Sequence, residues 1–228
     1  MDSPTNFRHL LEIDLLNAEN DAAAEQGCAA ALAAEPPAAA VLVAADRLGA
    51  ARMALPKSKG VTIAAVLNPD GAEPVSAVAD TATALAFGAD GIVLVLADAA
   101  GFDSDTAAQS RHMLATVAEL CRSGQKRLTV MVRQYQTEEQ LLHVAQTAWA
   151  AGCDFVSFAL PEDGSTPFAA LKEHLPAEGA GVKIWGLADD AAAEKCVAAW
   201  AEVFGSGQLD AQHLRLIVPA DWLAAAQA

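Results

Sequence analysis

The sequence predicts an α/β protein built as a single (β/α)8 TIM barrel that spans residues 1–228. Short apolar runs, each about the length of a strand, alternate with longer segments of helical periodicity from one end of the chain to the other. The apolar runs show little polar alternation, as expected for parallel strands that are covered on both faces. Eight strand-then-helix units in a chain of 228 residues fit the size and order of this barrel.

The predicted elements follow one another in strict alternation. The strands are expected at His9–Leu15, Ala38–Ala44, Val61–Leu67, Gly91–Leu96, Leu128–Val132, Phe155–Ala159, Val182–Trp185 and His213–Val218. The helices are expected at Asp21–Ala34, Arg47–Leu55, Glu73–Phe87, Asp105–Arg122, Glu138–Ala151, Pro167–His174, Asp189–Phe204 and Asp221–Ala226. Most of these helices open on an acidic residue, which the helix dipole favours. A doubly wound open sheet is the alternative, but its Gly-rich first turn is missing from Asn17–Asp21.

Composition and charge exclude several classes of function. The formal net charge of −15 disfavours nucleic acid as a partner, because affinity for phosphate backbones comes mainly from Lys and Arg. No apolar run approaches the roughly 20 residues that span a bilayer, and the N-terminus lacks the features of a secretory signal. We therefore expect a soluble cytoplasmic protein that does not act at membranes. The cysteines and histidines show no metal-ligand spacing, so we predict neither a metal nor another cofactor.

Several stretches, spread in order along the chain, resemble the deoxyribose-phosphate aldolase family of class I aldolases, specifically its enterobacterial-type branch. The stretches are Ile13–Asn17, Thr62–Gly71, Ala84–Asp90, Ala151–Val156, Gly181–Lys183, Ala201–Gly205 and Asp210–Arg215. The resemblance implies a barrel that cleaves 2-deoxyribose 5-phosphate through an imine. It also implies a nucleophilic lysine on the sixth strand, a second lysine on the seventh and an aspartate on the fourth.

This chain departs from that pattern at the positions that carry the chemistry. Ser157 stands at the position of the Schiff-base lysine, and a hydroxyl cannot form an imine. Val93 stands at the position of the aspartate and cannot carry a proton. The glycine-rich phosphate loops implied after strands seven and eight are replaced by Gly186–Asp189 and Ile217–Asp221. Asp14 and Lys183 are the two polar groups of the implied site that remain.

Lys183 and Asp14 are accordingly the candidate catalytic residues. Lys183 could point to the mouth of the barrel as a cation, proton carrier or imine nucleophile, or it could form a buried ion pair with Asp14 or Asp189. Asp14 could act as a general base, or it could accept backbone N–H groups at the first loop.

Four further residues are candidate ligand-binding groups. Ser157 could offer a hydroxyl to a ligand or simply pack. Arg133 and Tyr135, at the end of strand five, could bind a carboxylate or phosphate, or could lie in a solvated loop. Trp185 lies two positions after Lys183 on the same strand, so it should share a face with Lys183 and could plug the mouth.

These observations leave three hypotheses. The first is a pseudoenzyme: an aldolase-like barrel that has lost cleavage of 2-deoxyribose 5-phosphate and binds a small molecule or a partner. The second is an active carbon–carbon lyase in which Lys183 forms the imine with a carbonyl substrate. The third is a structural subunit whose alanine-rich helices pack in a homo-oligomer. Fold alone does not decide between them.

Overall fold

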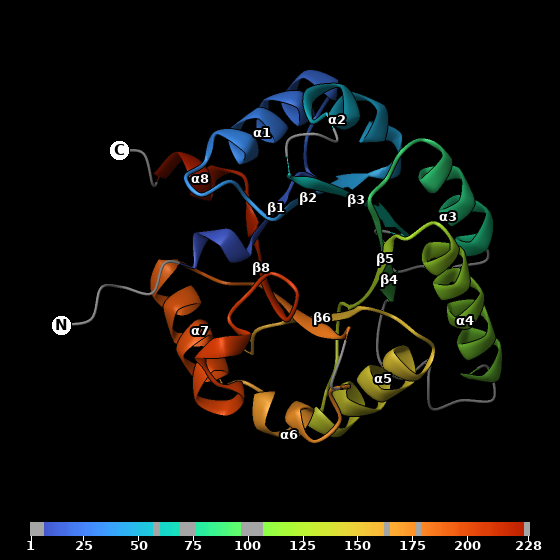
Figure 1. Cartoon of the computed structure of the whole chain (residues 1–228), viewed down its shortest axis with the longest axis vertical. Coiled ribbons are helices and arrows are strands. Elements are labelled where there is room, and N and C mark those ends of the chain that lie inside the picture. The colour runs from blue at the N-terminus through green and yellow to red at the C-terminus, as the bar shows by residue number, and fades with distance from the viewer. Residues whose placement is uncertain are drawn as a thin grey trace.

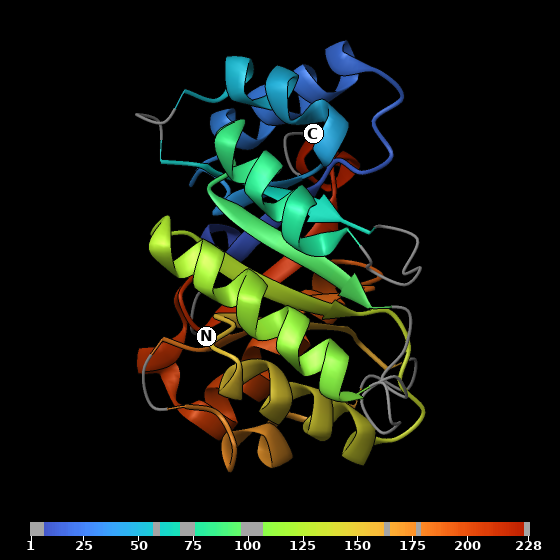
Figure 2. The same cartoon turned by 90° about the vertical axis from the view of Figure 1, so that its right-hand side faces the viewer.

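The strands close into a barrel, as the sequence predicts. In the computed structural model, which describes residues 7–56, 60–68, 76–96, 107–161, 165–176 and 179–225, eight parallel strands follow one another in chain order. The first strand, β1 (Leu11–Asp14), pairs with β2 (Ala40–Ala44) on one side and with β8 (Leu214–Pro219) on the other. This closure excludes the open-sheet alternative. The helices form an outer ring around the strands (Figure 1), and in side view α3 and α4 lie over the outside of the sheet (Figure 2).

The remaining elements alternate along the chain. The other strands are β3 (Thr62–Leu67), β4 (Gly91–Leu96), β5 (Arg127–Val132), β6 (Phe155–Ala159) and β7 (Gly181–Trp185). The helices are α1 (Asp21–Ala33), α2 (Leu48–Ala54), α3 (Ala77–Ala86), α4 (Ala107–Ser123), α5 (Glu138–Ala150), α6 (Phe168–Lys172), α7 (Asp190–Phe204) and α8 (Asp221–Ala225).

The main difference from the sequence prediction is at the first strand. His9 and Leu10 belong to a short 3₁₀ turn, Arg8–Leu10, so β1 begins only at Leu11. The predicted starts of α3 and α4, Glu73 and Asp105, lie outside the described residues.

Side-chain caps fix where three of the helices begin. Asn20 accepts a hydrogen bond from the backbone N–H of Ala23 at α1 (2.9 Å), and Thr137 accepts one from that of Gln140 at α5 (3.2 Å). Asp189 accepts one from Ala192 at α7 (2.8 Å). Each oxygen satisfies one of the N–H groups that a helix leaves unpaired at its start.

The main core lies between the strands and the helices. Trp200 on α7 is fully buried there, with its ring edge-on to Phe168 of α6 at 5.2 Å between centroids. Its indole N–H donates to the carbonyl of Gln208 (3.1 Å). All four cysteines are buried and free. Burial, followed by nearby acidic charge, raises the pKa of Cys28 to about 11, which keeps the thiol protonated at neutral pH.

Candidate functional site

The barrel lumen is divided into an apolar part and a charged part. Alternate residues of the strands form a small cluster, separate from the main core, made up of Leu42, Ala64, Val66, Val93, Val95, Met131 and Ile217. Leu16 and Trp185 pack against this cluster, so Trp185 fills lumen space, as the alternation of side chains along β7 predicts.

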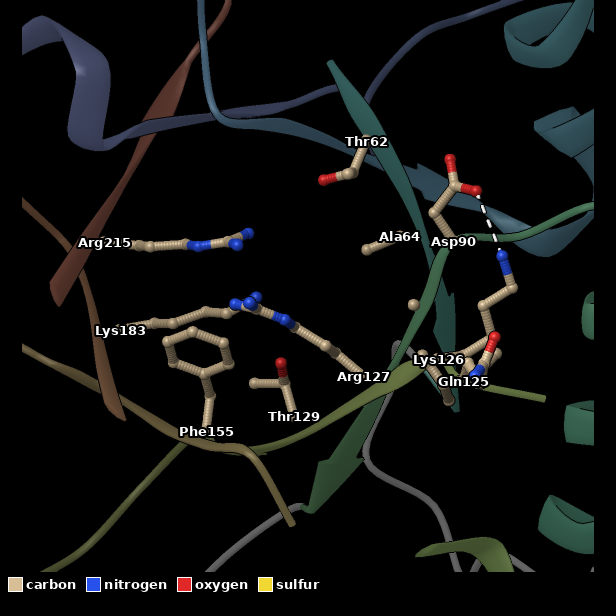
Figure 3. Close-up of a pocket in the computed structure, with 12 residues that line it drawn as sticks. Thr62, Ala64, Asp90, Gln125, Lys126, Arg127, Thr129, Phe155, Lys183 and Arg215 are labelled. Atoms are coloured by element: carbon tan, nitrogen blue, oxygen red, sulfur yellow. Dashed lines mark hydrogen bonds and ion pairs between the residues drawn. The ribbon is translucent and has the colours of Figure 1, made fainter. Parts of the chain in front are cut away.

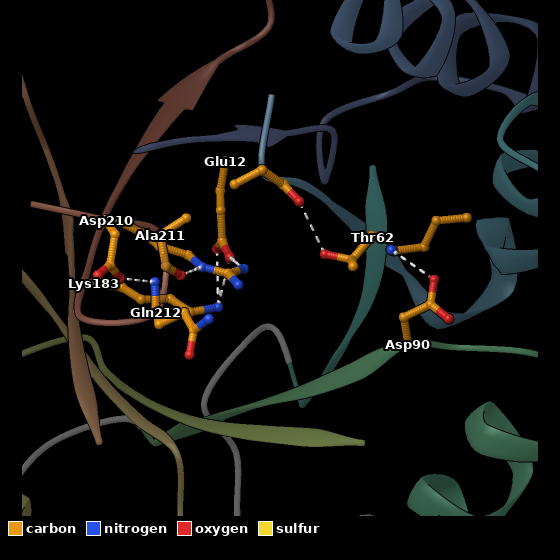
Figure 4. A network of polar contacts seen from close by, with 10 residues as sticks. Glu12, Thr62, Asp90, Lys183, Asp210, Ala211 and Gln212 are labelled. Atoms are coloured by element: carbon orange, nitrogen blue, oxygen red, sulfur yellow. Dashed lines mark hydrogen bonds and ion pairs between the residues drawn. The ribbon is translucent and has the colours of Figure 1, made fainter. Parts of the chain in front are cut away.

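The charged part centres on Glu12, which lies on β1 and is fully buried. Lys183 Nζ donates to Glu12 Oε1 at 2.8 Å and to Oε2 at 3.0 Å, and Arg215 Nη1 also donates to Oε1. Figure 4 shows this network seen from close by. The ion-pair partner of Lys183 is therefore Glu12, and the predicted pairing with Asp14 or Asp189 is wrong.

Three cations surround the ring of Phe155 beside this network. The distance to the ring centroid is 4.8 Å from Lys183 Nζ, 4.9 Å from Arg215 Cζ and 5.6 Å from Arg127 Cζ. In Figure 3 the side chains of these three residues converge on one region of the lumen. The aromatic face offers each cation a favourable contact, but it does not neutralise their charge.

Burial and neighbouring charges set the protonation of this cluster. Burial is the largest influence on Lys183 and, with the nearby Arg215 and Arg127, lowers its pKa to about 8 in spite of Glu12. Burial alone would raise the pKa of Glu12, but Lys183 and Arg215 together hold it below its ordinary value. Glu12 is thus an anion at neutral pH, while Lys183 is still mostly protonated there but loses its proton far more readily than a solvated lysine.

Lys183 extends toward the amino-terminal end of the barrel. Phe155 and Arg127, which lie close to it, are the first residues of β6 and β5. Since all strands are parallel, these positions lie at the same end. The active sites of TIM barrels lie at the opposite, carboxyl end. Of the two alternatives for Lys183, the structure therefore agrees with a buried ion pair and not with a side chain that points to that mouth.

The residues at the positions of the implied nucleophile and aspartate are buried and hold no charge. Ser157 is completely buried and is paired in register with Lys183 on one side and Met131 on the other. Among the described residues, its hydroxyl has no hydrogen-bond partner. Val93 belongs to the apolar lumen cluster. The middle of the lumen is thus packed at the level where an imine would form.

The other predicted residues are dispersed. Asp14 accepts the N–H of Leu16 (2.8 Å), and burial, opposed by this bond, raises its pKa. Arg133 is exposed just beyond the end of β5. Tyr135 donates its hydroxyl to the carbonyl of Ala159 (3.2 Å). No hydrogen bond or ion pair joins Asp14 or Arg133 to Lys183 in the described part of the chain. The binding and catalytic roles assigned to them stay predictions.

Sequence reasoning missed Glu12, Arg127 and Arg215. Each is a charged residue within or at the start of an apolar strand, and Glu12 lies two positions before Asp14 on the same strand face. A charged residue in an otherwise apolar strand could have indicated these three residues, because a charged side chain is rarely buried without a partner.

The described residues contain neither a membrane-spanning helix nor a cluster of metal ligands. No described helix is long and apolar enough to cross a membrane. Within the same ranges, no three His, Cys, Asp or Glu side chains come together in a way that could hold a metal ion.

Comparison with known proteins places the fold among aldolase structures. No family model and no curated protein matches the sequence. The apo form of a "putative deoxyribose-phosphate aldolase" from Toxoplasma gondii superposes with a TM-score of 0.79 at 20% identity, covering 97% of this chain and 93% of that chain. A deoxyribose phosphate aldolase from Aeropyrum pernix gives 0.71 at 15% identity, covering 100% and 94%, and QR15, an aldolase, gives 0.74 at 18%, covering 98% and 95%. At these identities the similarity establishes a shared fold.

Proposed function

We propose that this chain is a divergent deoxyribose-phosphate aldolase-like barrel, derived from the enterobacterial-type branch, that no longer cleaves 2-deoxyribose 5-phosphate through an imine. The barrel is retained to bind a small molecule. The aldolase structures that share its fold support the origin of the scaffold. The residues of the lumen support the loss of the reaction.

One observation carries this proposal. The amine of Lys183 donates to both carboxylate oxygens of Glu12 and extends away from the carboxyl end of the barrel. An imine nucleophile must present a neutral amine, with its lone pair free, to a carbonyl carbon. Here the ion pair with Glu12 favours the protonated amine of Lys183. The buried Ser157 stands at the position of the implied nucleophile.

The loops at the carboxyl end also fit poorly with a phosphate site. Asp189 directs its carboxylate to the start of α7, and Leu187 before it is buried. Pro219 at the end of β8 has no N–H to donate. A phosphate bound here would meet a negative charge and fewer backbone donors than the glycine-rich loops that the resemblance implies.

A second candidate function is a lyase that uses Lys183, and the lowered pKa of Lys183 favours it. Glu12 is close enough to take the ammonium proton, after which Nζ could add to a carbonyl carbon and release water to give the imine. Substrate would have to arrive from the amino end, because the apolar cluster fills the lumen near Ser157.

Borohydride trapping separates these two functions. The protein is incubated with acetaldehyde or with 2-deoxyribose 5-phosphate, reduced, and measured by intact mass and peptide mapping beside Lys183→Met. We expect no adduct at residue 183 with either compound, because Glu12 holds the amine protonated. Lys126→Met is the matched control for adventitious labelling of a less buried lysine. An adduct that maps to Lys183 and disappears in Lys183→Met would establish the lyase and refute the loss of imine chemistry.

The homo-oligomer is a further proposal. The Aeropyrum pernix neighbour is described as tetrameric, and the outer helices of this chain are rich in alanine. Small side chains allow helices of neighbouring subunits to approach closely.

A further inference from the structure

A cavity opens at the amino-terminal end of the barrel. Its volume is about 320 Å³, at the lower end of the roughly 300–1,000 Å³ typical of small-molecule sites. Its inner wall is formed by Arg127, Thr129, Phe155, Lys183 and Arg215, while Thr62, Asp90 and Lys126 lie across from them (Figure 3). The cavity lies at the opposite end from the loops after β7 and β8.

The inner wall carries more positive than negative charge. Arg127, Lys183 and Arg215 all lie over the ring of Phe155, and Glu12 is the carboxylate that bonds to two of them. Among the groups that these contacts join, three cations meet one anion, an excess of two positive charges, while Asp154 and Asp210 also act on Arg127 electrostatically. This excess stands out in a chain whose net charge is −15.

Asp90, the acidic residue across the cavity, has other partners. It binds Arg52 at 2.5 Å and Lys126 at 3.4 Å, and it accepts the backbone N–H of Ile63 at 3.1 Å. On this side of the cavity, the single carboxylate of Asp90 is therefore already paired with two cations, Arg52 and Lys126. Asp90 does not offset the excess on the inner wall.

The three cations differ in their partners within the described part of the chain. Lys183 donates to Glu12, and Arg215 donates to Glu12 and, through Nε, to the carbonyl of Ala211 (2.7 Å). In the described part of the chain, the guanidinium of Arg127 has its contact with Phe155 but no hydrogen bond or ion pair. Burial, and then the charge of Arg215, lower the pKa of Arg127, although the carboxylates of Asp154, Glu12 and Asp210 oppose this shift.

We propose that this cavity binds a compact dianion, namely inorganic phosphate or a phosphate monoester, with Arg127 as its principal ligand. A phosphate dianion matches the excess of two charges, and its tetrahedral oxygens accept hydrogen bonds from donors that converge on one point. The hydroxyl of Thr129 adds a polar group to the wall, whereas that of Thr62 donates to the carbonyl of Ala39 at 3.0 Å. A dicarboxylate separates its two charges and suits this arrangement less well. The site does not depend on whether Lys183 forms imines.

Calorimetric titration of the full chain with inorganic phosphate at pH 7.5 tests this site. Arg47 is the matched control, because it lies just after β2, at the carboxyl end of the barrel, and does not line the cavity. We expect Arg127→Gln to weaken phosphate binding about tenfold to a hundredfold, the effect of losing a charge-assisted hydrogen bond. Arg47→Gln should bind phosphate as the wild type does. 2-Deoxyribose 5-phosphate should bind without an adduct, and uncharged 2-deoxyribose and succinate should bind much more weakly.

The remaining outcomes are equally decisive. No heat with phosphate at millimolar concentration, or a loss of binding in Arg47→Gln that Arg127→Gln does not share, would overturn the proposal. Tighter binding of succinate than of phosphate would also contradict it. If Arg127→Gln fails to fold, Arg127→Lys is used instead, because it keeps the positive charge but loses the paired N–H donors of the planar guanidinium. Phosphate should then raise the melting temperature of the wild type more than that of Arg127→Lys, and equal shifts would refute the role of Arg127.

Discussion

Replacing Glu12 by Gln is expected to destabilise the protein by about 3–5 kcal/mol, because it leaves two buried cations without their anion. Glu12 is fully buried and accepts from both Lys183 and Arg215. An amide of the same size keeps the packing but removes the charge. Urea denaturation followed by circular dichroism measures the change in the free energy of unfolding.

Asp14→Asn is the matched control for this change, since Asp14 lies two residues further along β1. It accepts one backbone hydrogen bond, from Leu16, which an amide oxygen can also accept. We therefore expect a loss of less than about 1 kcal/mol. Equal losses at Glu12 and Asp14 would contradict the assignment of Glu12 as the anion of the lumen.

The loss of stability caused by Glu12→Gln should depend on pH. The folded state holds the pKa of Glu12 below its ordinary value of 4.5. Its carboxylate therefore contributes stability above pH 4.5, and this contribution is lost as the pH falls through the folded-state pKa. The stability difference between the wild type and Glu12→Gln should accordingly narrow in acid. A difference that stays constant down to acid unfolding would argue against an ionic role.

Introducing lysine at Ser157 is the second change with a large expected effect. Ser157 is fully buried beside Lys183 and Met131, so the longer side chain overfills the lumen and adds a cation next to another. We expect a loss of at least about 3 kcal/mol, from overpacking together with a buried charge that lacks a new partner. Because Val93 supplies no proton relay, we also expect no cleavage of 2-deoxyribose 5-phosphate.

Ser157→Ala isolates the effect of the hydroxyl. Among the described residues this hydroxyl has no partner, so its removal should leave stability unchanged or slightly raised. Acetaldehyde release and urea denaturation are measured on both variants. A Ser157→Lys protein with wild-type stability that releases acetaldehyde would show that the lumen still accommodates the aldolase reaction.

Sequence periodicity was sufficient for the fold. The predicted bounds of β4 and β6, Gly91–Leu96 and Phe155–Ala159, coincide with those observed, because both are apolar runs bounded by turn residues. The first strand was predicted too early, since the apolar character of Leu10 suits a buried 3₁₀ turn as well as a strand. Periodicity indicates that Leu10 is buried, and a strand and a 3₁₀ turn would both bury it.

Strand periodicity could not predict the ion pair between Lys183 and Glu12. Strand alternation places Glu12, Asp14, Lys183 and Trp185 in the lumen, but it does not give the direction of a side chain along the barrel axis. Glu12 and Asp14 are separated by two residues, roughly 6–7 Å along a strand. Lys183 has a long flexible stem that can extend toward either end. Toward the carboxyl end, Trp185 and the apolar cluster fill the space beside Lys183. Toward the amino end, Glu12 and Phe155 provide its contacts.

We propose that the polar site of this barrel lies at its amino end and no longer at its carboxyl end. A crystal structure determined with 2-deoxyribose 5-phosphate tests this claim most directly. We predict that the phosphate lies against Arg127 in the amino-end cavity, with Lys183 still bonded to Glu12 and no covalent bond to the sugar. Phosphate density against Gly186–Asp189 at the carboxyl end, with the sugar carbon joined to Lys183 Nζ, would contradict it.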